Sequence, residues 1–181
     1  MRYFYLIICT LIIFACKEPQ ARKPVSVKSG ISLKTSAERT KKRLAAESEA
    51  IQYYIKKDST QQYLNSNHGF WFTYLKKKAV DSITPKYGNK VQFTYSIQNL
   101  KNDTLYNRTQ IGTKTHYIRQ ENIMEGLRQG LILMKANEEI KFIFPSQIAY
   151  GYKGDLNKIN PNTPIICNMM LLNIETKTEN K

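Results

Sequence analysis

The sequence predicts an α+β fold, with an antiparallel sheet packed on one short helix. Residues 91–97, VQFTYSI, place an apolar side chain at every second position, which is the period of a half-buried strand. The segments EEIKFIFP at 138–145 and PIICNMMLLNIE at 164–175 are further apolar runs of strand length. The segment NIMEGLRQGLILMK at 122–135 instead repeats apolar residues at helical spacing. These helical positions are Ile123, Leu127, Leu131 and Met134.

Weaker patterns complete the predicted sheet. The aromatic-rich segment GFWFTYLKKKAV at 69–80 favours a strand, and Pro85 and Gly88 after it mark a turn. The segment IGTKTHYI at 111–118 suggests another strand. The composition changes near residue 66, so we expect a domain at 67–178 that folds without the segments before it.

The first fifteen residues have the outline of a secretory signal peptide. One Arg precedes an apolar stretch from Tyr3 to Ala15, which is shorter than the roughly 20 residues that a membrane span needs. The stretch ends in IIFAC, which resembles the lipobox of bacterial lipoproteins and implies removal of residues 1–15 and acylation of Cys16. The alternative is an uncleaved anchor with an ordinary thiol at Cys16. Both interpretations place the protein on a membrane of the cell envelope, facing the periplasm.

Two segments separate this anchor from the predicted domain. Residues 16–35 mix Pro, Ser, Lys and Gly without periodicity and predict a tether. Residues 36–66 predict a helical spacer, with helix formers concentrated at 36–58 and a narrow apolar stripe. The favoured interpretation is a solvated spacer helix. A dimerisation helix and an arm that packs on the domain are the alternatives.

The charge and the cysteine and histidine counts limit the function classes. The net charge of +14 is spread along the chain without a nucleic-acid motif, so we expect no nucleic-acid partner and a mild attraction to anionic membranes. After processing, Cys167 is a lone thiol, so no disulfide framework is expected. His68 and His116 have no Cys or carboxylate at ligand spacing. We therefore expect neither a metal nor a cofactor.

The segment FIFPSQIAYGYKG, residues 142–154, ends a good strand with a loop rich in Tyr and Gly. Pro145 must end the strand because it has no N–H to donate to a ladder. Tyr150 and Tyr152 then have two interpretations: both fill the core, or one presents its hydroxyl in an apolar cavity.

Four segments, taken in order, resemble the FKBP class of peptidyl-prolyl isomerases. They are VQFTY at 91–95, LKNDTLYN at 100–107, IMEGLRQGLILMKANEEIKFIFPSQIAYGY at 123–152 and INPNTPI at 159–165. With its lipobox and spacer, the whole chain is similar to the gliding-motility-associated isomerase lipoproteins of the Bacteroidetes. The resemblance implies a twisted antiparallel sheet wrapped around the short helix, with proline-containing polypeptides as clients.

The resemblance also implies a site. Tyr150 matches the tyrosine that donates a hydrogen bond to the substrate carbonyl. The implied pocket residues are Tyr95, Tyr106, Asn107, Ile123, Met124, Leu127, Ile159 and Cys167. For Tyr95 and Tyr106, simple core packing is an equal alternative.

Three of these positions depart from the family pattern. Leu127, Asn107 and Cys167 stand where the best-known members have tryptophan, aspartate and phenylalanine. These departures predict a smaller apolar floor, reduced activity and weak binding of macrolide inhibitors. Two functions stay open: an isomerase that assists proline-limited folding of exported proteins, and a weakly active chaperone or scaffold of an envelope complex.

Overall fold

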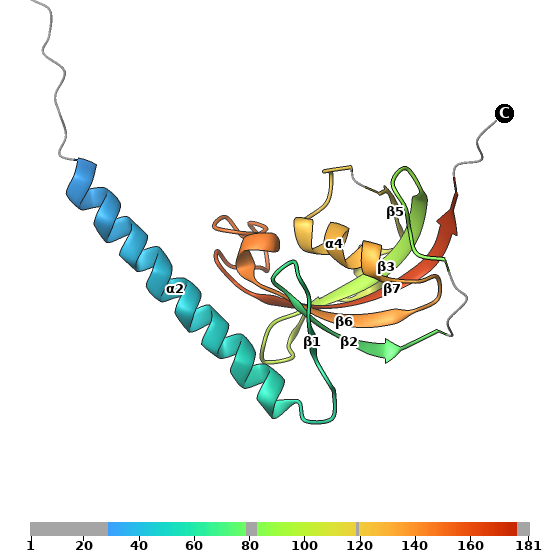
Figure 1. Ribbon diagram of the computed structural model, residues 1–181, viewed down its shortest axis with the longest axis horizontal. Coiled ribbons are helices and arrows are strands. Elements are labelled where there is room, and N and C mark those ends of the chain that lie inside the picture. The colour runs from blue at the N-terminus through green and yellow to red at the C-terminus, as the bar shows by residue number, and fades with distance from the viewer. Residues whose placement is uncertain (1–28, 79–82, 119, 177–181) are drawn as a thin grey trace, which may run out of the picture. The chain divides into compact units, whose positions relative to one another are not determined.

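The computed structural model describes residues 29–78, 83–118 and 120–176, and side chains of the first helix from residue 33 onward (Figure 1). The predicted signal peptide, Cys16 and most of the predicted tether lie outside the described residues. The chain divides into two units, residues 1–39 and 40–181, and the sheet and its site belong to the second. Among the described helices, none combines the length and apolar character that crossing a bilayer requires.

The predicted α+β fold is confirmed: seven strands form one antiparallel sheet. Along the sheet the order is β1-β2-β6-β7-β3-β4, and β5 also pairs with β3. The long strands β3 and β7 run side by side near the middle of the sheet (Figure 1). The bounds are β1 Leu64–Asn65, β2 Trp71–Lys76, β3 Lys90–Gln98, β4 Thr104–Tyr106, β5 Lys114–Tyr117, β6 Glu139–Phe144 and β7 Ile165–Glu175.

Helix α4, Glu125–Leu133, lies across one face of this sheet (Figure 1). Two glycines on α4 allow the close approach. A Cβ at Gly126 would lie 2.8 Å from the ring of Phe144, and one at Gly130 would lie 3.0 Å from the Cε of Met169. A larger residue at Gly126 would therefore displace the Phe144 ring or the helix, and one at Gly130 would need Met169 to move aside. The main core fills this interface and includes Phe70, Phe93, Leu127, Leu131, Phe142, Phe144 and Cys167.

The other face of the sheet is covered by part of helix α2, Ser29–Lys57. Successive side chains of a strand point to opposite faces, so Ile143 of β6 points away from its neighbours Phe142 and Phe144. Ile143 packs with Ile51 and Tyr54 of α2 and with Ile166 of β7. Ile51 and Tyr54 are 1% and 7% exposed.

Residues 40–57 of α2 are therefore an arm that packs on the domain, which was the less favoured of the sequence interpretations. The sequences of β6 and β7 explain this packing. Residues 142–144 of β6 (FIF) and 165–166 of β7 (II) are unbroken apolar runs, which are typical of strands buried on both faces. The helix ends at Lys57, before the end predicted for the spacer at 66, and Leu64–Asn65 already pair with β2.

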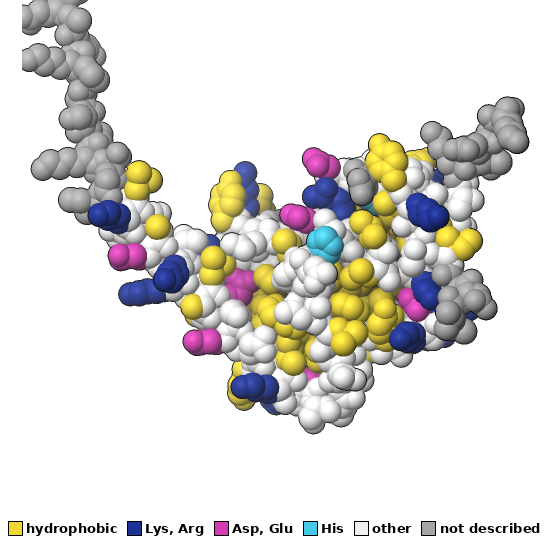
Figure 2. Space-filling model, viewed as in Figure 1, with side chains coloured by type: hydrophobic (Ala, Val, Ile, Leu, Met, Phe, Trp, Pro, Cys, Tyr) yellow, Lys and Arg dark blue, Asp and Glu magenta, His cyan; other side chains and the backbone are white. Residues whose placement is uncertain are grey.

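The exposed surface carries scattered positive charge. In the space-filling view, hydrophobic side chains gather over the central part of the sheet, and Lys and Arg side chains surround them (Figure 2). Two of the lysines are paired with acids: Lys90 lies 2.9 Å from Glu175, and Lys141 lies 3.2 Å from Asp58. This distribution agrees with a charge spread along the chain.

Candidate active site

Tyr150 lies in the loop that follows β6. Pro145 ends the strand, and the 3-10 turn η2, Ser146–Ile148, begins directly after it. The carbonyl of Ser146 then accepts hydrogen bonds from the N–H groups of Ala149 at 3.2 Å and Gly151 at 2.8 Å. Gly151 has a φ of +63°, a backbone conformation that glycine adopts without steric cost. The residues on both sides of Tyr150 are therefore hydrogen-bonded to Ser146.

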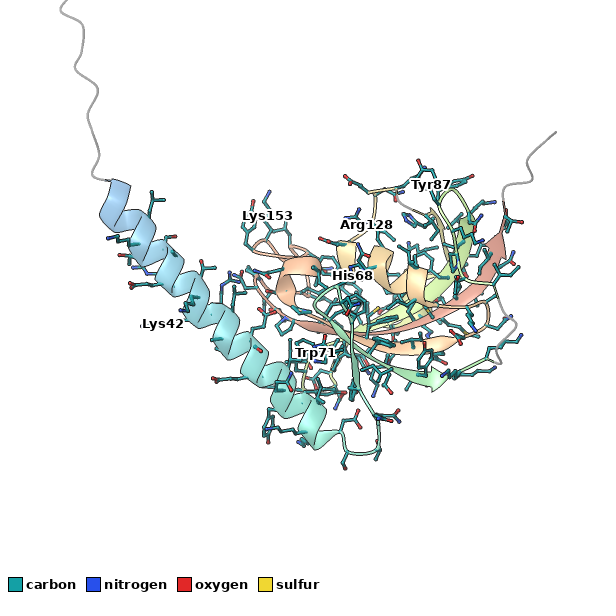
Figure 3. All side chains as sticks on the ribbon, viewed as in Figure 1. Lys42, His68, Trp71, Tyr87, Arg128 and Lys153 are labelled. Atoms are coloured by element: carbon teal, nitrogen blue, oxygen red, sulfur yellow. The ribbon has the colours of Figure 1, made fainter. Side chains whose placement is uncertain are left out.

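The two tyrosines of this loop have different surroundings. Tyr150 is half-buried and packs against the main core, whereas Tyr152 is 74% exposed. The next residue, Lys153, projects outward from the loop (Figure 3). Tyr150 is thus the loop tyrosine that faces the apolar core, and Tyr152 takes no part in it.

The hydroxyl of Tyr150 stays protonated at neutral pH. Burial raises the pKa of Tyr150, and the nearby ionisable groups of Tyr95, Cys167, Asp155 and Tyr106 raise it further, in that order. Each of these groups would be negative when ionised, so a phenolate among them is disfavoured. A protonated phenol in this position is a hydrogen-bond donor to an incoming acceptor.

Tyr95 lines the same region from β3. It is half-buried, and its ring stacks on that of Phe93 with centroids 5.8 Å apart. Burial raises the pKa of Tyr95 to about 12, with a smaller effect from Cys167. Tyr95 therefore also carries a neutral hydroxyl, and it packs against the same core as Tyr150.

Tyr106, at the end of β4, is bound by the loop after Tyr150. Its hydroxyl donates to Asp155 Oδ2 and accepts from Asn157 Nδ2 at 3.1 Å. The ammonium of Lys158 lies 5.0 Å from the centre of the Tyr106 ring. The hydrogen bond to Asp155 and, to a smaller extent, burial raise the pKa of Tyr106. Tyr106 thus connects the loop at 155–158 to β4.

Asp155 was not among the residues predicted from the sequence. Its Oδ1 accepts the N–H groups of Asn157 at 2.9 Å and Ile159 at 2.7 Å. Burial raises the pKa of Asp155, but the hydrogen bonds from Tyr106 and the backbone of residues 157–159 outweigh this and lower it. An ionised carboxylate is therefore held against the Tyr106 hydroxyl, and its charge adds to the rise in the pKa of Tyr150.

Apolar side chains from three elements complete the region. Leu127 of α4 and Ile159 of the loop are each 2% exposed, and Cys167 of β7 is fully buried. Burial raises the pKa of the Cys167 thiol, so it is a neutral apolar group here. Ile123 and Met124, the two residues before α4, are half-buried against the same core.

A sequence profile of the FKBP-type peptidyl-prolyl cis-trans isomerase family matches residues 81–172. The chain belongs to this family. It is therefore an FKBP-type isomerase, an enzyme that acts on polypeptides containing proline.

Solved structures share the FKBP fold. A peptidyl-prolyl cis-trans isomerase from Pseudomonas syringae pv. tomato matches with a TM-score of 0.62 and 19% identity, over 76% of this chain and 96% of that one. FkpA from Escherichia coli matches with a TM-score of 0.59 and 19% identity, over 96% of this chain and 82% of that one. A comparison with curated protein sequences gave no match.

The FKBP domain brings all but one of the predicted pocket residues into its main core. Tyr95, Tyr106, Ile123, Met124, Leu127, Tyr150, Ile159 and Cys167 belong to it or pack against it. Asn107 is exposed and caps the short helix α3, Arg108–Ile111. Its Oδ1 accepts from the N–H of Gln110 at 2.8 Å and from the Thr109 hydroxyl at 2.7 Å. The Asn107 side chain is therefore engaged within its own turn.

Residue 107 thus supplies no acid, and the acid that the structure places against Tyr106 is Asp155. The sequence carried one sign of it: Asp155 follows Gly154 in the same loop as Tyr150. A Cβ at Gly154, where φ is +67°, would lie 2.1 Å from the carbonyl oxygen of Ile159. Glycine is thus required at residue 154 for the loop to fold back and place Asp155 against Tyr106.

The chemistry available to the FKBP site is that of a neutral donor in apolar surroundings. Within the described ranges, no group of three His, Cys, Asp or Glu side chains could hold a metal ion. The site offers the Tyr150 hydroxyl, the hydroxyl of Tyr95, the carboxylate of Asp155 and an apolar wall.

Proposed function

We propose that this isomerase is lipid-anchored in the cell envelope, where it assists proline-limited folding of exported proteins. The support is the IIFAC stretch ahead of the tether, together with membership of the isomerase family. Isomerisation of X–Pro bonds takes tens to hundreds of seconds without a catalyst, so exported chains benefit from one. The resemblance to gliding-motility-associated lipoproteins makes components of that machinery the clients we propose first.

The observation that carries the mechanism is a protonated, half-buried Tyr150 against an apolar core. Rotation about a peptide bond must break amide resonance, against a barrier of about 18–20 kcal/mol. An apolar site favours the twisted amide, whose carbonyl is less polar, over the planar one. The Tyr150 hydroxyl donates to the substrate carbonyl and holds it while the proline ring turns. No nucleophile is needed for this reaction.

The Tyr150→Phe variant tests this role of the hydroxyl. The substitution keeps the ring and its packing and deletes the donor. A hydrogen bond of this kind contributes about 0.5–1.5 kcal/mol, so kcat/KM for a proline peptide should fall about two- to tenfold. The measurement is a peptide isomerisation assay, with circular dichroism to confirm that the variant is folded.

Tyr152→Phe is the matched control because Tyr152 lies in the same loop and is exposed. It should retain the wild-type kcat/KM. Equal rates for wild type and Tyr150→Phe would remove the Tyr150 hydroxyl from the mechanism.

The second candidate function is a weakly active chaperone or scaffold in an envelope complex. Leu127 favours it, because a leucine there leaves a smaller pocket floor than the tryptophan of the best-known family members. The same assay separates the two functions. A wild-type chain that suppresses aggregation of a client and shows no isomerisation above background would support the chaperone.

The Cys16→Ser variant tests the anchor. If Cys16 is the acylated residue, the variant should accumulate as an unprocessed precursor or leave the membrane fraction. Metabolic labelling with a fatty acid and fractionation of cells measure both effects. Cys9→Ser is the control and should be processed and labelled normally. Normal labelling of Cys16→Ser would contradict the proposed anchor.

A further inference from the structure

The backbone of Ser146 helps to hold the loop that carries Tyr150. Its carbonyl accepts the N–H groups of Ala149 and Gly151, the residues on either side of Tyr150. The N–H of Ala149 is shared with the carbonyl of Pro145, also at 3.2 Å, whereas that of Gly151 is bonded to Ser146. A shift of Ser146 would therefore disturb the bonds on both sides of Tyr150. Ser146 itself is 1% exposed, so its own N–H and hydroxyl need partners within the protein.

Glu47 of α2 supplies both partners. The N–H of Ser146 donates to Glu47 Oε1 at 2.5 Å, and the Ser146 hydroxyl donates to Glu47 Oε2 at 2.7 Å. Glu47 is 8% exposed and lies 99 residues before Ser146 in the chain. One buried carboxylate thus binds Ser146 through two hydrogen bonds. Ser146 is the first residue of the loop 146–151, called the Tyr150 loop below.

Arg43 makes a second connection four residues earlier, on the same face of α2. Its guanidinium donates to the side-chain oxygen of Asn162. The N–H of Asn162 donates in turn to the carbonyl of Gly151 at 2.8 Å. Arg43 and Glu47 therefore reach the Tyr150 loop from its two ends.

We propose that Glu47 and Arg43 are positioning residues for the isomerase reaction, holding the loops on either side of Tyr150. Helix α2 is then part of the enzyme as well as a connection to the anchor. This inference rests on the proposed role of Tyr150 for its effect on catalysis, although the positioning itself does not.

The chemistry of Glu47 favours positioning over simple docking of the helix. Ile51 and Tyr54 already bury apolar surface between α2 and the sheet. Glu47 contributes hydrogen bonds rather than apolar area: the two donors of Ser146 replace the hydration that its carboxylate loses on burial. Because both oxygens of the carboxylate bind donors of the same residue, the two hydrogen bonds fix the position and orientation of Ser146.

The test uses the full-length chain, purified in detergent, with Glu47→Ala as the main variant. Two variants on the same helix are controls: Glu49→Ala removes an exposed carboxylate, and Ile51→Val weakens docking without touching Ser146. Ser146→Ala removes one of the two bonds and serves as a second probe should Glu47→Ala fold poorly. Each chain is assayed at a temperature where circular dichroism shows it to be folded.

Two readouts are taken from every chain. Nuclear magnetic resonance of isotope-labelled tyrosine reports the ring of Tyr150, whose signal is assigned by its absence in Tyr150→Phe. The peptide assay gives kcat/KM, including that of the double variant Glu47→Ala/Tyr150→Phe. In Glu47→Ala we expect a shifted or broadened Tyr150 signal and a kcat/KM lowered about two- to tenfold, up to the loss in Tyr150→Phe.

If Glu47 acts through Tyr150, the double variant should be no slower than Tyr150→Phe alone, because the two losses share one cause. An unchanged Tyr150 signal in folded Glu47→Ala and Ser146→Ala would overturn the inference, as would the same change in the Ile51→Val control. A changed signal together with a fully active Tyr150→Phe supports the positioning and refutes only the proposed catalytic role of Tyr150.

Discussion

Replacing Leu127 by Ala should lower the free energy of unfolding by about 2–5 kcal/mol. Leu127 is 2% exposed and lies on α4 between the two glycines that bring this helix against Phe144 and Met169. Because the glycines already set the closest approach, the helix cannot move inward to fill the space. The cavity therefore stays open, and the loss should fall near the upper end of that range.

The same substitution should also lower kcat/KM, since Leu127 belongs to the apolar core against which Tyr150 packs. Chemical denaturation measures the stability, and the peptide assay at a temperature where the variant is folded measures the activity. Ile132→Ala is the matched control: Ile132 lies on the same helix and is 38% exposed. A stability loss no larger than that of Ile132→Ala would contradict the buried role of Leu127.

The sheet and α4 could be predicted because their residues follow simple periods. Val91, Phe93 and Ile97 are buried on β3 as their alternation predicts, and Leu127 and Leu131 are buried on α4. These patterns depend on neighbours that are close in sequence. The Tyr150 loop could be found as well, because Pro145 and the glycines mark where the strand must end.

The contacts between distant segments could not be predicted in the same way. Glu47 looks like one of several charged residues on a helix, and its partner Ser146 lies 99 residues later. The apolar stripe of α2 is a weak signal. Among the apolar side chains of this helix that the structure describes, only Ile51 and Tyr54 are buried. Asp155 was missed for a related reason: its partner Tyr106 comes 49 residues earlier, so their pairing depends on the fold.

Helix α2 should contribute several kcal/mol to the stability of the isomerase domain. In a fragment of residues 58–178 the faces of Ile143 and Ile166 that α2 covers would meet water, and the burial of Ile51 would be lost. Fully burying one such side chain is worth about 1.5–3 kcal/mol. Since part of the burial of Ile143 and Ile166 comes from the sheet itself, we expect a loss of about 3–6 kcal/mol.

This loss is large beside a total stability of about 5–15 kcal/mol for a domain. The fragment 67–178, which the composition of the sequence suggested as an independent domain, should be weaker still, because it also loses β1 and the pair of Asp58 with Lys141. Urea denaturation of fragments 40–178, 58–178 and 67–178 ranks the three. Equal midpoints for 40–178 and 58–178 would show that the helix only rests on the sheet. A clear drop on removing residues 40–57 would show instead that the isomerase domain begins within α2, so that this helix and the catalytic fold share one core.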